Sequence, residues 1–349
     1  MLKRKISVNE TAEAKRYFDE CRNAVIVTHS APDGDAVGSS LALKEYMEKK
    51  GKKVTVIVPN LYPDFLRWMH DADKIVIFER QKSLCYNLVN YADLICCLDF
   101  NTLSRIDDLA VPVSKSKARK MLVDHHMEPD KFANLTISRP DCCSTCELVF
   151  RLLDSLGEIH NVNTYGAEDL YVGMCTDTGG FTYNSNDPDV FSIIAELLRK
   201  GINKDIIYRR LFNTYTADRF RLMGYILSEK LRYFPELHAS YFCVSREELQ
   251  RYHFLKGDLE GVVNIPLSIR GQKLSISLRE DTEKPVVWIS VRSYDDFSAR
   301  EMAEKFFNGG GHFNAAGGHI DGTLDAAEEI RKKALAAYSE QLKSVTREG

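Results

Sequence analysis

The sequence predicts an α/β chain with a parallel sheet covered by helices on both faces, a helical linker, and a smaller α/β domain with a mixed sheet. Three observations predict this. The first part alternates short apolar runs with helical patterns, which is typical of strands buried on both faces. The middle is charged and helical without a strong strand. Strand patterns then return beside a glycine-rich segment. The expected boundaries are 1–186, 187–236 and 237–349.

Five apolar runs in the first part are expected to be strands because each is short and rich in branched residues. They are NAVIVTH (23–29), KKVTVIVP (52–59), DKIVIF (73–78), DLICCLDF (93–100) and KARKMLVDHH (117–126). The segment AVGSSLALKEYMEKKG predicts a helix ended by Gly51. A capping box from Ser144 to Glu147 predicts the start of another helix.

Three runs in the last part are also expected to be strands. They are ASYFCVS (239–245), LSISLRE (274–280) and PVVWISVRS (285–293). In the third run Trp288 alternates with Val286, so we expect it in the core. A second capping box, Ser298 to Glu301, begins a predicted helix, and the glycine-rich segment NGGGHFNAAGGHI follows it.

Composition narrows the class of function. Hydrophobic residues make up 44%, charged residues 28%, and the net charge is -3. Proteins that track long nucleic acids usually carry a basic stripe, which is missing here, so a long polyanion is an unfavourable substrate. No apolar run has the length of a membrane span, and the basic N-terminus lacks the apolar core of a secretory signal. Nine irregularly spaced cysteines favour reduced thiols and a cytoplasmic protein.

Acids and histidines gather where the predicted strands end. In an open α/β sheet, ligands bind outside the carboxyl ends of the strands, so three strands deliver these side chains to one edge. A further acid lies where a helical pattern breaks at two glycines. The residues are His29, Asp33 and Asp35 after the first strand, Asp99 after the fourth, Asp124, His125 and His126 after the fifth, and Asp177 in GMCTDTGGF.

Such a cluster predicts a metal site, because buried carboxylates are costly unless a cation neutralises them. Carboxylate and imidazole together suit manganese, cobalt, zinc or iron better than calcium. Two metals about 3.5–4 Å apart can activate water and bind both oxygens of a phosphoryl displacement. Taken singly, PDGDAVG could be an acidic turn before a helix, and Asp99 a helix N-cap. Together, the segment PDGDAVG, Asp99, the sequence DHH (124–126) and Asp177 occur in this order at strand or helix ends, which favours the metal site.

At these residues the chain resembles the DHH-type phosphoesterases, which have a Rossmann-like N-terminal domain. The resemblance rests on THSAPDGDAVGS, CLDFN, LVDHH and CTDTGGF, and in the C-terminal half on WISVRS and GGGHFNAAGG, which are similar to the DHH-associated domain. The two-domain architecture looks most like the nanoRNase and 3′-phosphoadenosine-5′-phosphate (pAp) phosphatase group. That group includes relatives that hydrolyse cyclic-dinucleotide products and is often labelled exopolyphosphatase-related.

The resemblance implies a role for each position in the N-terminal half. Two divalent ions, expected to be Mn²⁺, would hold a nucleophilic water between them. His126 would contact the phosphate or act as an acid near the leaving group, and Asp124 would orient a histidine. The implied ligands are His29, Asp33 and Asp99 for one ion, and Asp35, Asp99, His125 and Asp177 for the other.

The resemblance also implies substrate contacts in the C-terminal half. Backbone amides of Gly309, Gly310 and Gly311, with His312 beside them, would approach a terminal phosphate or base. Arg292 is a candidate phosphate clamp, because a guanidinium binds phosphate bidentately. Arg105 either reaches the substrate or forms a surface salt bridge. The roles of Phe313 and of the Cys143/Cys146 pair stay open.

We therefore expect a two-metal phosphoesterase with its substrate between two domains. The expected substrates are very short oligonucleotides or a nucleoside bisphosphate such as pAp. The alternatives are a phosphodiesterase for linear cyclic-dinucleotide products of the pApA type, an inorganic polyphosphate or pyrophosphate hydrolase, and a non-enzymatic nucleotide sensor. The expected partner is the nucleotide substrate alone, without a membrane or a long nucleic acid. The sequence leaves open a homodimer, the cleavage polarity and the identity of the metal.

Overall fold

The computed structural model describes residues 2–344 and divides the chain into two compact units, Met1–Thr214 and Tyr215–Gly349. The stretch that the sequence sets aside as a helical linker, 187–236, is shared between them. Helices α7 (Pro188–Arg199) and α8 (Lys204–Phe212) belong to the first unit, and α9 (Ala217–Tyr225) belongs to the second. No helix among the described residues is long and apolar enough to cross a membrane.

The first unit contains a six-stranded sheet in the order β3-β2-β1-β4-β5-β6, and every neighbouring pair is parallel. This confirms the predicted parallel sheet. The strands are β1 (Asn23–Val27), β2 (Lys53–Val58), β3 (Val76–Ile77), β4 (Leu94–Leu98), β5 (Arg119–Asp124) and β6 (Leu135–Ser138). The sequence analysis missed β6, because four half-buried residues are too short a run to show a strand pattern.

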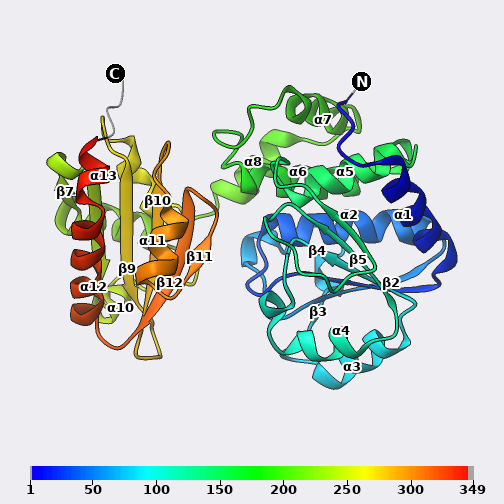
Figure 1. The fold of residues 1–349 in the computed structure, drawn as a ribbon, viewed down its shortest axis with the longest axis horizontal. Helices are drawn as coiled ribbons and strands as arrows, with labels where there is room; N and C mark the ends of the chain where they lie inside the picture. The colour runs from blue at the N-terminus through cyan, green and yellow to red at the C-terminus, as the bar shows by residue number, and fades with distance from the viewer. Residues whose placement is uncertain (1, 345–349) are drawn as a thin grey trace. The chain divides into compact units, whose positions relative to one another are not determined.

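Helices cover both faces of this sheet (Figure 1). One face carries α1 (Val8–Glu20), α2 (Gly34–Lys49), α5 (Thr145–Ser155) and α6 (Thr164–Asp177), and the other carries α3 (Lys82–Tyr91) and α4 (Ala110–Lys115). Strand β4 shows why its sequence LICCL is continuously apolar. Cys96 packs into the core on the first face and Cys97 into the core on the second.

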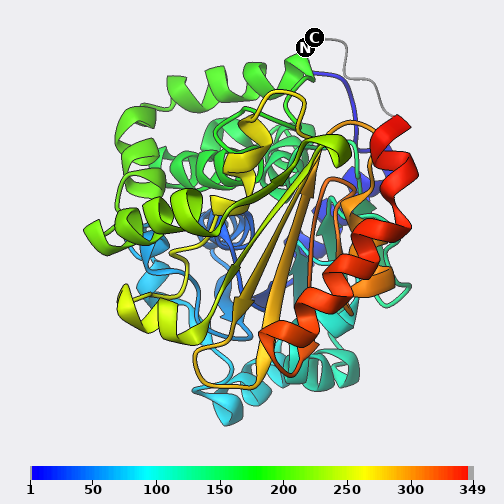
Figure 2. The same ribbon diagram turned by 90° about the vertical axis from the view of Figure 1, so that its left-hand side faces the viewer.

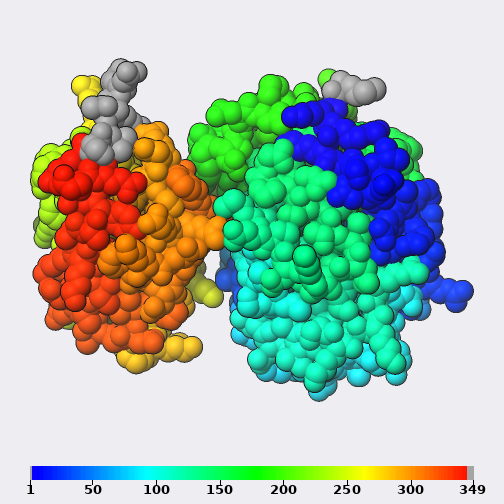
Figure 3. Space-filling view, viewed as in Figure 1, coloured from blue at the N-terminus to red at the C-terminus, as the bar shows by residue number. Residues whose placement is uncertain are grey.

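The N-terminal segment lies on the surface of the first unit (Figure 3). Its Lys5 side chain is nevertheless buried, with Nζ 3.7 Å from Glu147 Oε1 and 3.3 Å from Asp187 Oδ2. Glu147 in turn accepts a hydrogen bond from Arg151 Nε at 2.7 Å. These contacts connect the N-terminal segment to the first turn of α5, and removal of either charge would leave the other buried without its partner.

The second unit has a mixed sheet in the order β11-β12-β10-β9-β8-β7. Its strands are β7 (Arg232–Phe234), β8 (Ala239–Val244), β9 (Leu274–Glu280), β10 (Val286–Ser293), β11 (Gly310–Gly311) and β12 (Ala315–Asp321). Only β8 and β9 are parallel; the other pairs are antiparallel. The helices are α9, α10 (Arg246–Arg251), α11 (Ala299–Phe306), α12 (Leu324–Ala337) and α13 (Ser339–Ser344). Figure 2 shows α12 crossing one face of the sheet.

Trp288 is not in the core of this unit, so that expectation was wrong. Its side of β10 faces away from α11 and α12, and the residue is 43% exposed. The alternation in β10 is real, but Val287, Ile289 and Val291 form the buried side instead. Periodicity alone identifies two faces of a strand without saying which one is covered.

Helices α2 and α6 approach each other closely because glycines lie where they cross. A Cβ atom added at Gly38 would lie 2.4 Å from the backbone oxygen of Asp169. One added at Gly173 would lie 2.2 Å from Cys146 Sγ and 2.6 Å from Asp35 Oδ1. The absence of a side chain at Gly173 therefore places Asp35 of α2 directly against α6.

We predict that Gly173→Ala lowers the free energy of unfolding by about 1–3 kcal/mol, because the added methyl group overpacks this contact. Urea-induced unfolding measures the effect. Gly224→Ala in α9 is the matched control, since nothing lies within 4 Å of its added Cβ. That change should leave stability unaltered or raise it by up to about 1 kcal/mol. Equal losses in the two variants would contradict the packing argument.

Candidate metal centre

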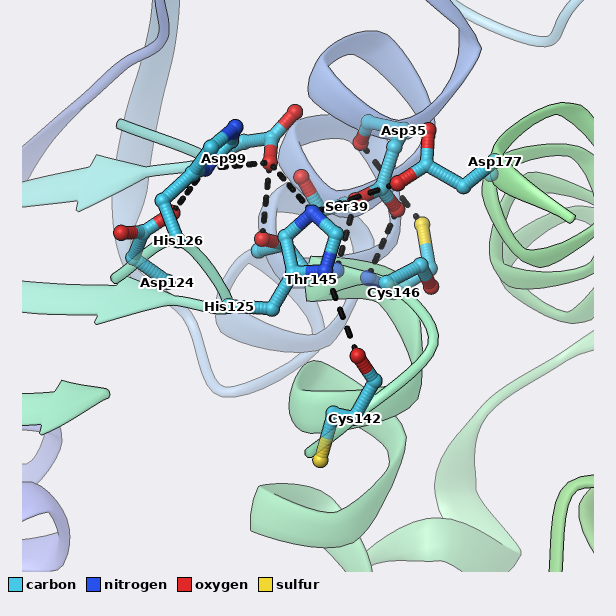
Figure 4. Close-up of polar contacts among 12 residues, drawn as sticks. Asp35, Ser39, Asp99, Asp124, His125, His126, Cys142, Thr145, Cys146 and Asp177 are labelled. Atoms are coloured by element: carbon cyan, nitrogen blue, oxygen red, sulfur yellow. Dashed lines mark hydrogen bonds and ion pairs between the residues drawn. The ribbon is translucent and has the colours of Figure 1, made fainter. Parts of the chain in front are cut away.

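The side chains expected to converge do so at the carboxyl end of the parallel sheet (Figure 4). His29 follows β1, Asp99 follows β4, and Asp124 is the last residue of β5. Two acids come from the start of α2, where Asp33 is the N-cap and Asp35 lies in the first turn. Asp177 is the last residue of α6. Strand ends and helix ends thus bring residues from distant parts of the sequence to one site.

Asp99 lies between two histidines. Its Oδ2 is 3.3 Å from His29 Nε2, and its Oδ1 is 3.6 Å from His125 Nε2. The residue is 2% exposed and has a φ of 64°, in the left-handed region. Aspartate tolerates this region better than most residues, and such strained conformations concentrate at functional sites. The turn aims the carboxylate across the end of the sheet.

The donor atoms fall into clusters with metal-ligand spacing. In each of three groups, one donor atom per residue lies within 4.8 Å of the others. His29, Asp33 and Asp99 form the first group, Asp35, His125 and Asp177 the second, and Asp99, Asp124 and His126 the third.

Burial and crowding perturb the pKa values here. Burial alone would lower the pKa of His29, but the Asp33 and Asp99 carboxylates raise it well above its usual value. Burial and the charges of Asp99 and Asp177 raise the pKa of Asp35. Burial also raises the pKa of Asp177 to about 6, although the hydrogen bond from His125 opposes this. Clustered carboxylates of this kind bind positive charge, either as protons or as cations.

The residues present fit divalent cations. Imidazole and carboxylate donors match transition metals better than calcium. Asp124 supplies a further sign: its Oδ1 is 2.7 Å from His126 Nδ1, whereas its buried Oδ2 has no hydrogen-bond partner among the described residues. A buried carboxylate oxygen without a partner is costly, and a nearby cation would reduce that cost.

The N-terminus of α5 forms part of this site, which the sequence analysis missed. The backbone N–H groups of Thr145 and Cys146 donate to Asp35 Oδ2 and Oδ1 at 2.6 and 2.8 Å. The Thr145 hydroxyl donates to Asp99 Oδ1 at 2.9 Å (Figure 4). Unpaired amides at a helix start bind anions, so the capping box at Ser144 was the available signal.

The two cysteines of the C-x-x-C are buried free thiols. Ser144 caps α5 by accepting from Glu147 N at 3.0 Å, but the Glu147 carboxylate accepts from the Cys143 backbone N–H instead of completing the predicted box. The pair thus lies in the turn that starts α5. Cys146 contributes its backbone N–H to Asp35.

The expected substrate residues fall into two places. Arg105 belongs to the first unit, where its carbonyl oxygen accepts from Ser30 N at 2.7 Å, beside the loop that carries His29. The others lie together at one end of the sheet in the second unit. Arg292 is opposite Ala315, its Nη1 donates to Ala316 O at 3.1 Å, and Gly311 pairs with Ala316.

The glycine run has a structural role of its own. A Cβ added at Gly309 would lie 1.9 Å from Gly317 O, and Gly311 has a φ of 141°. These glycines let β11 pair closely with β12, and His312 then turns the chain through a hydrogen bond from its N–H to Ala315 O at 2.8 Å. Phe313, in this turn, is 46% exposed.

Comparisons with known proteins agree with this geometry. Residues 23–174 match the model of the DHH family, N-terminal domain, and residues 243–343 match that of the DHHA1 domain. A bifunctional oligoribonuclease and PAP phosphatase, NrnA, of Thermus thermophilus is 31% identical over 91% of this chain and 89% of its own length.

Solved structures give the same result. The crystal structure of an exopolyphosphatase-related protein from Bacteroides fragilis has a TM-score of 0.95 and 45% identity, covering 98% of this chain and 100% of that one. Exonuclease RecJ bound to manganese shares the fold, with a TM-score of 0.54 and 13% identity over 99% of this chain and 97% of its own. With both domain models matched in order, and with a relative that is 31% identical over 91% of this chain, the chain belongs to the DHH family and is a hydrolase of phosphate esters.

Proposed function

We propose that the protein hydrolyses short oligonucleotides and nucleoside 3′,5′-bisphosphates such as pAp with the help of two divalent ions, preferably Mn²⁺. The position of Asp99 carries this proposal, because its two oxygens face two histidines that belong to different donor clusters. One carboxylate can therefore serve both ions. The similarity to the Thermus oligoribonuclease and PAP phosphatase supports this choice of substrate.

The proposed ligands are His29, Asp33 and Asp99 for one ion, and Asp35, Asp99, His125 and Asp177 for the other. Bound there, the ions would supply Lewis acidity, lowering the pKa of water and neutralising phosphate charge. The chain itself does the positioning. The α5 amides hold both oxygens of Asp35, and the Thr145 hydroxyl fixes the orientation of Asp99.

His126 is the proposed contact for the phosphate or the leaving group. The Asp124 carboxylate accepts a hydrogen bond from Nδ1 of His126 and so orients the imidazole ring. In the second unit, Arg292, His312 and the glycine amides are the proposed contacts for the nucleotide. Arg105 is a further candidate beside the His29 loop. This division separates chemistry from recognition.

Removing the shared carboxylate should abolish both metal binding and turnover. Loss of a residue that only supports a metal ligand costs about 10–100-fold, so Asp99→Asn should lower kcat by more than that. Metal content after dialysis against Mn²⁺ and hydrolysis of pAp are the measurements. Asp108→Asn is the control, because Asp108 is an exposed partner of Lys82. Normal activity in the Asp99 variant would rule out the shared-ligand proposal.

The Thr145 hydroxyl allows a subtler test. Thr145→Val keeps the size of the side chain and the backbone N–H to Asp35 but removes the donor to Asp99 Oδ1. We expect kcat to fall about 10–100-fold, with the affinity for Mn²⁺ also reduced. Thr145→Ser retains the hydroxyl and should recover most of the activity. If the valine and serine variants are equally impaired, packing and not the hydrogen bond is what matters here.

Substrate length is the third test of this function. Because the net charge is -3 and the sequence has no basic stripe, little should hold a long strand by its phosphates. We expect kcat/KM to be higher for dinucleotides to pentanucleotides than for a strand of about twenty nucleotides. A labelled length series at fixed salt measures this. Rates that rise steadily with length and fall steeply with salt would indicate a processive exonuclease instead.

A further inference from the structure

The sheet of the second unit has one face that is only half covered. Helices α11 and α12 bury the inner face, on which Ile276, Val287 and Val291 lie. On the outer face, Phe242 and Val244 of β8 are covered by apolar residues of α9, α10 and the segment 262–263. The segment 262–268 also contacts β10, but this cover leaves Trp288 of that strand 43% exposed. The open part of the face thus belongs to the strands beside the glycine run.

Three side chains form a row across this open part. Trp288 on β10 is opposite His319 on β12 and opposite Arg279 on β9, so all three lie on the same face. The rings of Trp288 and His319 have centroids 5.9 Å apart and are tilted by 50°. The two rings are not stacked on each other, and the indole stays partly exposed. Arg279 lies beside it in the row, where its guanidinium also packs over the ring of Phe254, 5.3 Å from the ring centroid.

The indole is held in a fixed orientation. Its Nε1 donates to Asp281 Oδ2 at 2.7 Å, and Asp281 Oδ1 accepts from the backbone N–H groups of Glu283 and Lys284 at 2.9 Å. A rigid aromatic ring loses little conformational entropy when a ligand stacks on it. An exposed tryptophan whose polar atom is already satisfied is well suited to stack against a flat, apolar partner.

The row has a defined separation from the proposed phosphate contact. Trp288 and Arg292 are four residues apart on the same face of β10, with Ser290 between them. At about 3.4 Å per residue their Cα atoms are about 14 Å apart. Successive phosphates of a stacked strand are only ~3.4 Å apart along its axis, so this separation suits a phosphate at Arg292 and a base at Trp288 that belong to different nucleotides of one strand.

We propose that Trp288 and His319, with Arg279 beside them, form a stacking subsite for a base of a short oligonucleotide whose terminal phosphate lies at Arg292. This rests on the proposed function and deepens it. The subsite recognises any base, because every base has a flat π face. It contributes to substrates with several bases and leaves the hydrolysis of a nucleoside bisphosphate, which has only one, unaffected.

The first experiment compares substrates on one variant. Stacking of a base on an aromatic side chain contributes about 1–3 kcal/mol, so Trp288→Ala should lower kcat/KM for trinucleotides to pentanucleotides by roughly 5–150-fold. The loss should appear in KM rather than kcat, and pAp hydrolysis should stay at the wild-type rate. Trp288→Phe keeps an aromatic ring and should retain most of the activity on oligonucleotides.

A binding measurement separates this inference from the catalytic proposal. The chain has two tryptophans, so Trp68→Phe leaves Trp288 as the single reporter. In EDTA, where metal-dependent turnover stops, a tetranucleotide should quench its fluorescence. A tetranucleotide that is abasic at every position should not. This readout does not depend on hydrolysis.

Three outcomes would overturn the inference while leaving the proposed function standing. They are unchanged oligonucleotide kinetics in Trp288→Ala, an equal loss on pAp and on oligonucleotides, and equal quenching by the abasic strand. If the wild-type protein instead hydrolyses neither pAp nor any short oligonucleotide in Mn²⁺, the proposed function fails. Base-dependent quenching would then still identify a nucleotide-binding face.

Discussion

The cost of burying negative charge governs the first unit. Asp35, Asp99 and Asp124 are almost fully buried at the end of the parallel sheet, where an unneutralised carboxylate is strongly unfavourable. Two sets of groups stabilise these carboxylates: the α5 amides donate to Asp35, and two imidazoles lie beside Asp99. Much of the surrounding structure holds these donors in place, from the ion pairs of Lys5 to the glycine at 173.

The site also depends on α2 and α6, two helices that pack closely against each other. The acids of α2 lie at its N-terminal end, where a helix favours negative charge. Asp177 lies at the C-terminal end of α6, where the helix dipole does not favour a carboxylate. Its pKa is raised to about 6. The imidazole of His125, 3.2 Å away, compensates in part. The two helices thus supply two carboxylates, Asp35 from α2 and Asp177 from α6, whose pKa values are both raised.

The parallel sheet and its edge of acids could be predicted from sequence because they depend on local patterns. Apolar runs such as LICCL identify buried strands, and the residue that follows each strand must lie at the carboxyl edge. Contacts that depend on three-dimensional proximity could not be predicted. Nothing near Thr145 indicates that its hydroxyl meets Asp99, which is 46 residues away. The exposed position of Trp288 could not be predicted for a related reason: the helices that bury one face of its strand are distant in the sequence.

Every one of the nine cysteines is a buried free thiol, and this has a consequence for dynamics. Burial raises the pKa of Cys97 to about 12, so the thiolate that reacts with alkylating reagents is scarce while the fold is closed. Alkylation therefore requires local opening. Eight of these thiols belong to the first unit, and Cys243 alone belongs to the second. The alkylation rate of each cysteine-containing peptide therefore measures how often that part of each unit opens locally.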